Sequence, residues 1–176
     1  MIDLLKKKTA ELIVAGKLKH KAHSEITFSS AFKKSFSILI LMPQNDKDYR
    51  ESFQILDYLE SQGKTLTILT NDFRVSLLPA KYRNKAIGFA ITEVSKLKLP
   101  SHKLIERIRN KSFDVVIDLN REENLFYSYI ANVVKSKIRV GFKKRKAESY
   151  YNFLVEVSDS DSTKSYINFL NCIKMF

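Results

Sequence analysis

The sequence predicts an α/β fold in which helices cover both faces of a mostly parallel sheet. The apolar runs "FSILILM" (36–42) and "FDVVIDL" (113–119) are typical of strands buried on both faces. Segments with helical periodicity lie between such runs, so strands and helices alternate along the chain. With 176 residues and 44% hydrophobic content, the chain can bury a core of its own. These observations together indicate a Rossmann-like arrangement.

The first half of the chain supplies an amphipathic helix followed by three strands. The helix is expected over residues 2–19, and its narrow apolar stripe consists of Ile2, Leu5, Leu12, Ile13 and Leu18. The strand at 36–42 ends at Pro43. Asp48 is expected to cap a helix over 49–61, which Gly63 ends. Strands over 64–70 and 85–91 follow, and the loop between them carries some local structure.

The second half continues the alternation. A short helix is expected over 101–110, with Ser101 at its start after Pro100, and it precedes the strand at 113–119. The remaining expected elements are a helix over 122–135, strands over 138–142 and 150–157, and a closing helix over 161–176 capped by Asp161 or Ser162. The chain therefore divides into a basic helical extension, residues 1–35, and a Rossmann-like domain, residues 36–176.

Positive charge is concentrated in three segments. The chain has 31 Lys and Arg against 19 Asp and Glu, a net charge of +12. Residues 1–34 carry a net charge of +5, and residues 81–111 and 135–146 carry +7 each, so the rest of the chain is net negative. Scattered lysines often form only a solvated surface, but this segregation favours a surface that binds a polyanion.

Cysteine content and hydropathy limit the classes of protein to which the chain can belong. The single cysteine, Cys172, excludes an intramolecular disulfide, and we expect it to be a buried, inert thiol. Charges interrupt the apolar residues at the start of the chain, which is unlike a signal peptide. The longest apolar run, residues 38–42, is far too short to cross a bilayer. We therefore expect a cytoplasmic protein without stable membrane insertion.

Motifs for cofactors and metals are weak. The four glycines, at 16, 63, 88 and 141, cannot form a phosphate-binding loop or a dinucleotide fingerprint, so no cofactor is expected. His20 and His23 have a metal-ligand spacing but lack a third ligand, and no metal is expected. Asp118 and Asn120 end a strand, where open α/β sheets bind ligands. Capping of the next helix is an equally good role for them.

The order of these elements resembles the N-terminal, acceptor-side half of glycosyltransferase family 9, the lipopolysaccharide heptosyltransferases. Three segments carry the resemblance: the strand, turn and helix leading to "KTLTIL" (64–69), "FDVVIDLN" (113–120) and "KSKIRVGF" (135–142). The helix "DSTKSYINFLNCI" (161–173) also resembles the one that closes that half. The resemblance covers roughly residues 36–173 and implies a Rossmann-like domain.

Departures from that family bear on activity. The family has a Gly-Asp turn after its first strand, whose Asp is thought to act as the base. Here Lys47 stands where the glycine would be and Asp48 where the Asp would be. A second domain binds the sugar donor in the family, and the chain is expected to lack it. The resemblance thus implies a catalytic role for Asp48 only if a partner supplies that domain. Otherwise Asp48 is a helix N-cap.

The sequence therefore favours a non-catalytic RNA-binding protein, in a ribosome or another stable ribonucleoprotein, with rRNA and neighbouring ribosomal proteins as partners. The residues expected to contact phosphates are Lys6, Lys7, Lys8, Lys17, Lys19, Lys21, Lys135, Lys137, Arg139, Lys143, Lys144, Arg145 and Lys146. Residues 143–146 are expected to be too dense in charge for neutralisation within the protein, with Tyr150 and Tyr151 stacking on bases. The first helix would face the domain through Ile2, Leu5 and Leu12. The alternatives are a glycosyltransferase half-enzyme and a peripheral membrane or envelope factor.

Overall fold

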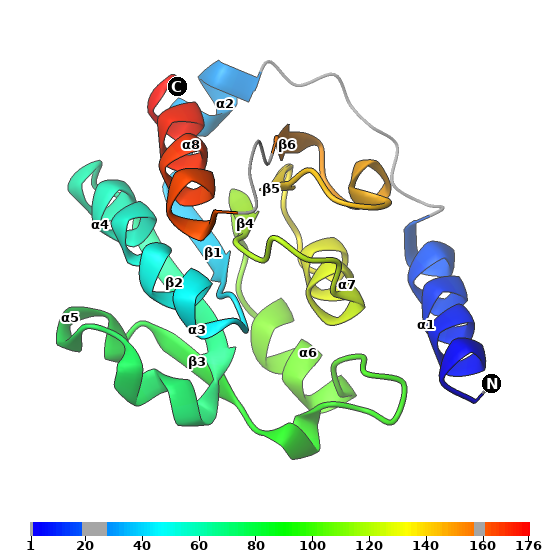
Figure 1. Cartoon of the computed structure of the whole chain (residues 1–176). Coiled ribbons are helices and arrows are strands. Elements are labelled where there is room, and N and C mark those ends of the chain that lie inside the picture. Colours follow the sequence, from blue (N-terminus) through cyan, green and yellow to red (C-terminus); the bar gives the residue numbers. More distant parts are fainter. Residues whose placement is uncertain (1, 19–27, 157–160) are drawn as a thin grey trace.

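The computed structural model describes residues 2–18, 28–156 and 161–176, and it confirms the α/β class (Figure 1). One sheet contains six parallel strands in the order β3-β2-β1-β4-β5-β6. The strands are β1 (Ser37–Leu41), β2 (Thr65–Asn71), β3 (Ala86–Phe89), β4 (Val115–Asp118), β5 (Ile138–Phe142) and β6 (Phe153–Val155). The chain builds outward from β1 to β3 and then returns to place β4 beside β1. The switch in strand order therefore lies between β1 and β4.

Helices cover both faces of the sheet. The α-helices are α1 (Ile2–Leu18), α2 (Phe28–Lys34), α3 (Asp46–Glu51), α4 (Phe53–Ser61), α5 (Ala80–Arg83), α6 (His102–Arg109), α7 (Leu125–Val133) and α8 (Ser162–Lys174). Short 3-10 helices are η1 (Asp72–Leu77), η2 (Ile91–Glu93) and η3 (Ala147–Ser149). None of the described helices is long and apolar enough to span a bilayer.

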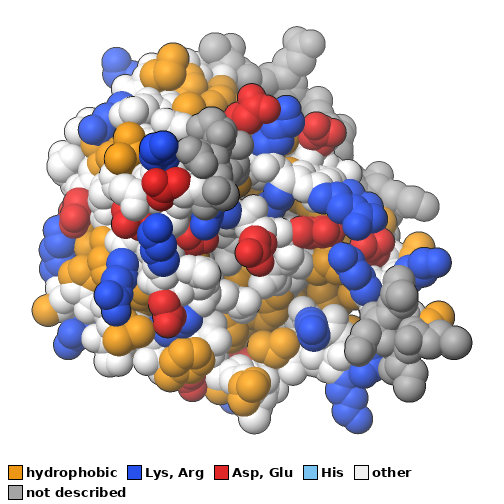
Figure 2. Space-filling view, viewed as in Figure 1, with side chains coloured by type: hydrophobic (Ala, Val, Ile, Leu, Met, Phe, Trp, Pro, Cys, Tyr) orange, Lys and Arg blue, Asp and Glu red, His pale blue; other side chains and the backbone are white. Residues whose placement is uncertain are grey.

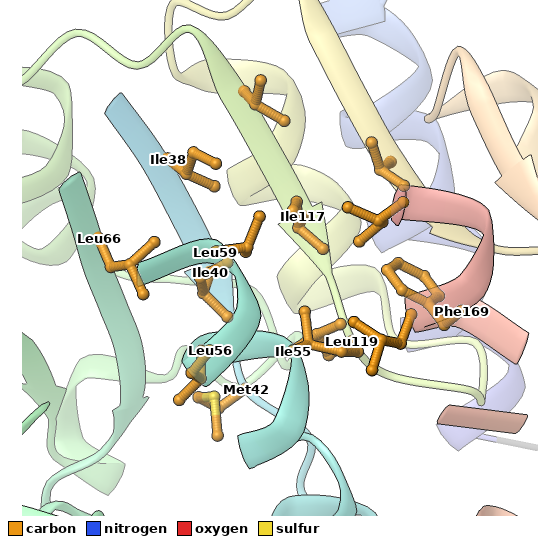
Figure 3. Packing of buried hydrophobic residues seen from close by; sticks show 14 of the residues in the cluster. Ile38, Ile40, Met42, Ile55, Leu56, Leu59, Leu66, Ile117, Leu119 and Phe169 are labelled. Carbon is orange, nitrogen blue, oxygen red and sulfur yellow. The ribbon is translucent and has the colours of Figure 1, made fainter. Parts of the chain in front are cut away.

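The core consists of two hydrophobic clusters, one on each face of the sheet. On one face Ile38 and Ile40 of β1 pack against α4, and Phe169 of α8 closes the same cluster (Figure 3). On the other face the intervening residues Leu39 and Leu41 pack with α1, α6 and α7. Alternate residues of β1 thus enter opposite clusters. This double burial explains why the strand has no polar alternation.

Helix boundaries correct two expectations and confirm two others. The helix expected over 49–61 begins earlier and is divided into α3 and α4 at Ser52. Asn45 caps α3, because its Oδ1 accepts from the backbone N of Lys47 at 2.9 Å. Asp48 as an N-cap is therefore wrong. Ser101 caps α6, as expected, and of the two candidates for α8 it is Asp161, not Ser162, that caps the helix.

The two helices before β1 both pack on the sheet domain (Figure 1). α1 lies against α7 and buries Ala10 and Val14, whereas Leu5 and Leu12 are 61% and 74% exposed. The expectation that α1 docks through Leu5 and Leu12 is therefore wrong; the side chain of Ile2 lies outside the described residues. α2 was not expected from the sequence. Its Phe28 stacks on Phe153 of β6 with ring centroids 4.0 Å apart.

Candidate nucleic-acid interface

A cleft of about 440 Å³ opens at the carboxyl edge of the sheet, between α1, the loop that follows η2 and the loop that follows β4. We call it the carboxyl-edge cleft. Its lining residues are Lys6, Lys7, Ala10, Gln44, Lys96, Leu97, Lys98, Glu123, Asn124 and Leu125. Figure 2 shows the molecule hollowed beside α1, with hydrophobic side chains inside the hollow and Lys and Arg side chains at its margin. Open parallel sheets bind ligands at this edge.

α1 supplies one wall of the cleft and two of its lysines. The buried Ala10 and Val14 hold the helix against the domain. An ion pair between Glu11 and Lys146, 2.8 Å long, joins α1 to the segment after β5. The hydrogen bond from Lys146 lowers the pKa of the Glu11 carboxyl and raises the pKa of Lys146 itself. Lys7, by contrast, meets Glu123 only at 3.7 Å, a distance longer than a hydrogen bond.

A tight turn presents the other two lysines, Lys96 and Lys98. The backbone N of Ser95 donates to the carbonyl of Leu99 at 2.8 Å, and the N of Lys98 donates back to the carbonyl of Ser95 at 2.8 Å. Leu99 is buried and anchors the turn in the core. Lys98 has a φ of 57°, a left-handed conformation that costs a lysine roughly 1–2 kcal/mol. The loop is therefore shaped to hold these side chains at the margin of the cleft.

A smaller pocket of about 70 Å³ adjoins the cleft at the switch point and shares Gln44, Glu123 and Asn124 with it. The buried Asp48 lies in its wall. Arg121 Nε donates to the two Asp48 carboxylate oxygens at 3.1 and 3.0 Å, and Ser162 Oγ donates to Oδ1 at 2.6 Å. The hydrogen bond to Asp48 raises the pKa of Arg121. Asp48 thus joins α3 to the loop after β4 and to α8.

Asp118 is the centre of a second buried network. It is 0% exposed and accepts from Lys144 Nζ at 2.7 Å, from Asn120 Nδ2 at 2.7 Å and from the Tyr151 hydroxyl. The Lys144 side chain is 6% exposed, and its Nζ also donates to the carbonyl of Asn120 at 2.8 Å. Burial, with the charge of Asp118 adding to it, raises the pKa of Tyr151 well above its ordinary value. The network connects β4 to the segment after β5.

The structure changes the set of lysines and arginines that lie at the surface. Arg139 is buried and donates to the carbonyls of Tyr150 and Ser136, both at 3.2 Å. Arg139 and Lys144 are therefore wrong as phosphate contacts, because each is committed to a partner inside the protein. The expectation that Tyr150 and Tyr151 stack on bases is also wrong, because both rings are buried.

The other sequence-predicted residues fall into three groups. Lys6, Lys7, Lys8, Lys135, Lys137 and Arg145 are exposed. Lys143 pairs with Glu156 at 3.1 Å and Lys146 with Glu11, so the expectation that residues 143–146 lack neutralising partners is wrong. The side chain of Lys17 and the whole of Lys19 and Lys21 lie outside the described residues.

Lys96 and Lys98 were missing from the predicted interface, although a signal for them existed. Both belong to the segment 81–111, whose net charge of +7 the sequence already marked. The cleft brings the basic segment 81–111 together with the basic N-terminal segment, residues 1–34. Lys135, Lys137 and Arg145 do not line it.

The histidines and the cysteine add no site. No group of three metal-ligating side chains occurs within 2–18, 28–156 and 161–176. His102 is exposed, with its Nδ1 3.4 Å from Glu106, and His20 and His23 lie outside the described residues. Cys172 is half-buried beside the core cluster of α4 and α8, so the expectation of a fully buried thiol is only partly met.

Comparison with known proteins identifies a family without a known activity. Residues 6–172 match the model of a family of unknown function, DUF6913, so the chain belongs to that family. Neither the curated proteins nor the solved structures contain a match to it.

Proposed function

We propose that this member of the DUF6913 family is a non-catalytic RNA-binding protein that holds phosphates around the carboxyl-edge cleft. The observation that carries the proposal is the convergence of Lys6 and Lys7 from α1 with Lys96 and Lys98 from the loop after η2. The lining thus contains four lysines and a single carboxylate, Glu123. An excess of positive charge in a concave site attracts polyanions and releases their counterions on binding.

The accessibility of these side chains supports the same function. All four lysines are exposed, and the Lys7 side chain retains 49% of its exposure even with its carboxylate neighbour. Lys8 and Arg145 are exposed as well and add to the positive field. Lysines of this kind contact phosphates without any catalytic geometry. We further propose rRNA in a cytoplasmic ribonucleoprotein, with neighbouring ribosomal proteins, as the setting, because of the small size and the net charge of +12.

The glycosyltransferase alternative has less support. Asp48 occupies the position of that family's base, but its carboxylate already accepts hydrogen bonds from Arg121 and Ser162. A general base must be free to take a proton from the substrate. One observation favours the membrane alternative instead: α1 exposes Leu5 and Leu12 beside lysines, as interfacial helices do.

Salt-dependent binding to ribosomal RNA tests the proposal. We expect affinity to fall steeply with salt concentration, and the variant Lys6→Gln/Lys7→Gln/Lys96→Gln/Lys98→Gln to flatten the log–log slope by about 3, at roughly 0.7 per single-stranded phosphate contact. The matched control is Lys33→Gln/Lys34→Gln/Lys103→Gln/Lys111→Gln, which removes the same charge from exposed positions outside the cleft.

Three outcomes would reject the RNA proposal. They are an absence of affinity at moderate salt, a flat salt dependence, and equal effects of the two quadruple variants. Sedimentation of lysate through a sucrose gradient tests the ribosomal setting, because we expect the protein to travel with ribosomal subunits. Vesicles containing anionic lipid provide the second arm. Binding to vesicles but not to RNA would favour the membrane alternative.

A further inference from the structure

The lining of the carboxyl-edge cleft is divided by chemistry. Ala10, Leu97 and Leu125 provide an apolar part, while the four lysines provide the charged part. A volume of about 440 Å³ falls within the range of roughly 300–1,000 Å³ that is usual for small-molecule sites. A ligand that fits this division has a flat apolar body and an attached anion. A nucleotide has both, with the base against the leucines and the phosphate at the lysines.

Glu123 adds a polar requirement to that ligand. Its Oε1 is buried and has no hydrogen-bond partner among the described residues, and its Oε2 has only the long contact with Lys7 at 3.7 Å. A buried carboxylate oxygen without a donor costs free energy that a ligand's N–H group would recover. The carboxylate is therefore an acceptor whose hydrogen bonds the protein leaves incomplete.

Among the bases, guanine presents the edge that fits a carboxylate. Its N1–H and N2–H₂ groups are adjacent donors, the arrangement that matches the two acceptor oxygens of a carboxylate. Adenine places an acceptor nitrogen beside its single amino group, and uracil has one N–H between two carbonyls. In both bases an acceptor atom would therefore face one of the carboxylate oxygens and repel it. Bases are read in this way on their Watson–Crick edges when they are unstacked.

We infer that the carboxyl-edge cleft binds one unstacked guanine nucleotide, with Glu123 accepting from the base and Lys6, Lys96 and Lys98 holding the phosphate. The inference deepens the proposed RNA function and rests on it, since it names the nucleotide that this site would take from a single strand. Glu123 is then the residue that determines specificity, and Leu97 is a contact for any base.

Titration with free mononucleotides tests the site separately from RNA binding. We expect GMP to bind about tenfold or more tightly than AMP, CMP or UMP, which is the usual discrimination of a good bidentate contact. Glu123→Gln should reduce that ratio to less than about threefold, while the matched control Glu122→Gln, on the exposed neighbour outside the cleft, should leave it unchanged. Leu97→Ser should weaken all four nucleotides alike.

The outcomes separate the inference from the proposed function. Equal binding of the four nucleotides to the native chain, or no GMP binding at millimolar concentration, overturns the guanine site and needs no variant. Loss of the preference in Glu122→Gln as well as in Glu123→Gln also overturns it. If RNA binds with the expected salt dependence while GMP shows no preference, the RNA function stands and the nucleotide site is rejected. Thermal unfolding of each variant establishes that it is folded before its affinity is compared.

Discussion

Lys143 and Lys144 are adjacent in the chain, yet we expect their substitution to have very different effects on stability. Lys144→Met removes the cation from a pair in which Asp118 is 0% exposed and Lys144 is 6% exposed, with 2.7 Å between Nζ and Oδ2. Breaking one side of a buried pair costs about 3–5 kcal/mol because the remaining charge stays buried. Tyr151 and Asn120 still donate to Asp118, so we expect about 3 kcal/mol, the lower end of that range.

Lys143→Met is the matched control. Its pair with Glu156 is exposed, at 55% and 76% of the two side chains, and exposed pairs contribute about 0–1 kcal/mol. For a chain of this size 1 kcal/mol corresponds to roughly 2–4 °C in Tm. Lys144→Met should therefore lower Tm by about 6–12 °C, and Lys143→Met by at most about 4 °C.

Urea unfolding followed by far-UV circular dichroism measures both free energies of unfolding. The double variant Asp118→Asn/Lys144→Met leaves no buried charge, so we expect it to recover most of the loss. Similar small losses in the two single variants would refute the reasoning, and so would a double variant less stable than Lys144→Met.

Three further predictions concern other contacts. Gly141→Val places a side chain 3.2–3.3 Å from the ring of Tyr151, so we expect a loss of about 1–3 kcal/mol in urea unfolding, and native-like stability would contradict this. Backbone amides before and in β1 donate to Asp114 and lower the pKa of its carboxyl. Its contribution is therefore present above pH ~4 and lost as pH falls through the folded pKa, so the stability deficit of Asp114→Asn should shrink below pH ~4 in acid titrations. Arg121→Gln should cost about 3 kcal/mol by leaving Asp48 without its cation, and adding Asp48→Asn should recover part of it; independent, additive losses would disprove the coupling.

The strands were predictable because the residues of each strand themselves show how it is buried. A run such as residues 36–42 lacks polar alternation since both faces of β1 are covered, and the sequence displays that directly. The caps at Ser101 and Asp161 were predictable for a similar reason, because each bonds to an amide only a few residues away.

The site could be predicted only in part, because its partners come from distant segments. The run at 143–146 suggests free charge, but the carboxylate that receives Lys144 lies 26 residues earlier. The docked face of α1 was missed because Ala10 and Val14 have smaller and less hydrophobic side chains than Leu5 and Leu12. Packing against α7 rewards small side chains at the point of close approach, and the periodicity of the sequence does not contain that information.

The carboxyl-edge cleft depends on the docking of α1 against the domain. Because Lys6, Lys7 and Ala10 all stand on this helix, the complete lining exists only while α1 is docked. The apparent Kd of any ligand then equals its intrinsic Kd divided by the docked fraction. The ligand in turn favours docking by RT ln(1 + [L]/Kd), about 2.7 kcal/mol at a hundredfold excess over Kd. The burial of Ala10 and Val14 and the partly exposed pair between Glu11 and Lys146 therefore influence affinity from outside the charged part of the cleft, because they stabilise the docked position of α1.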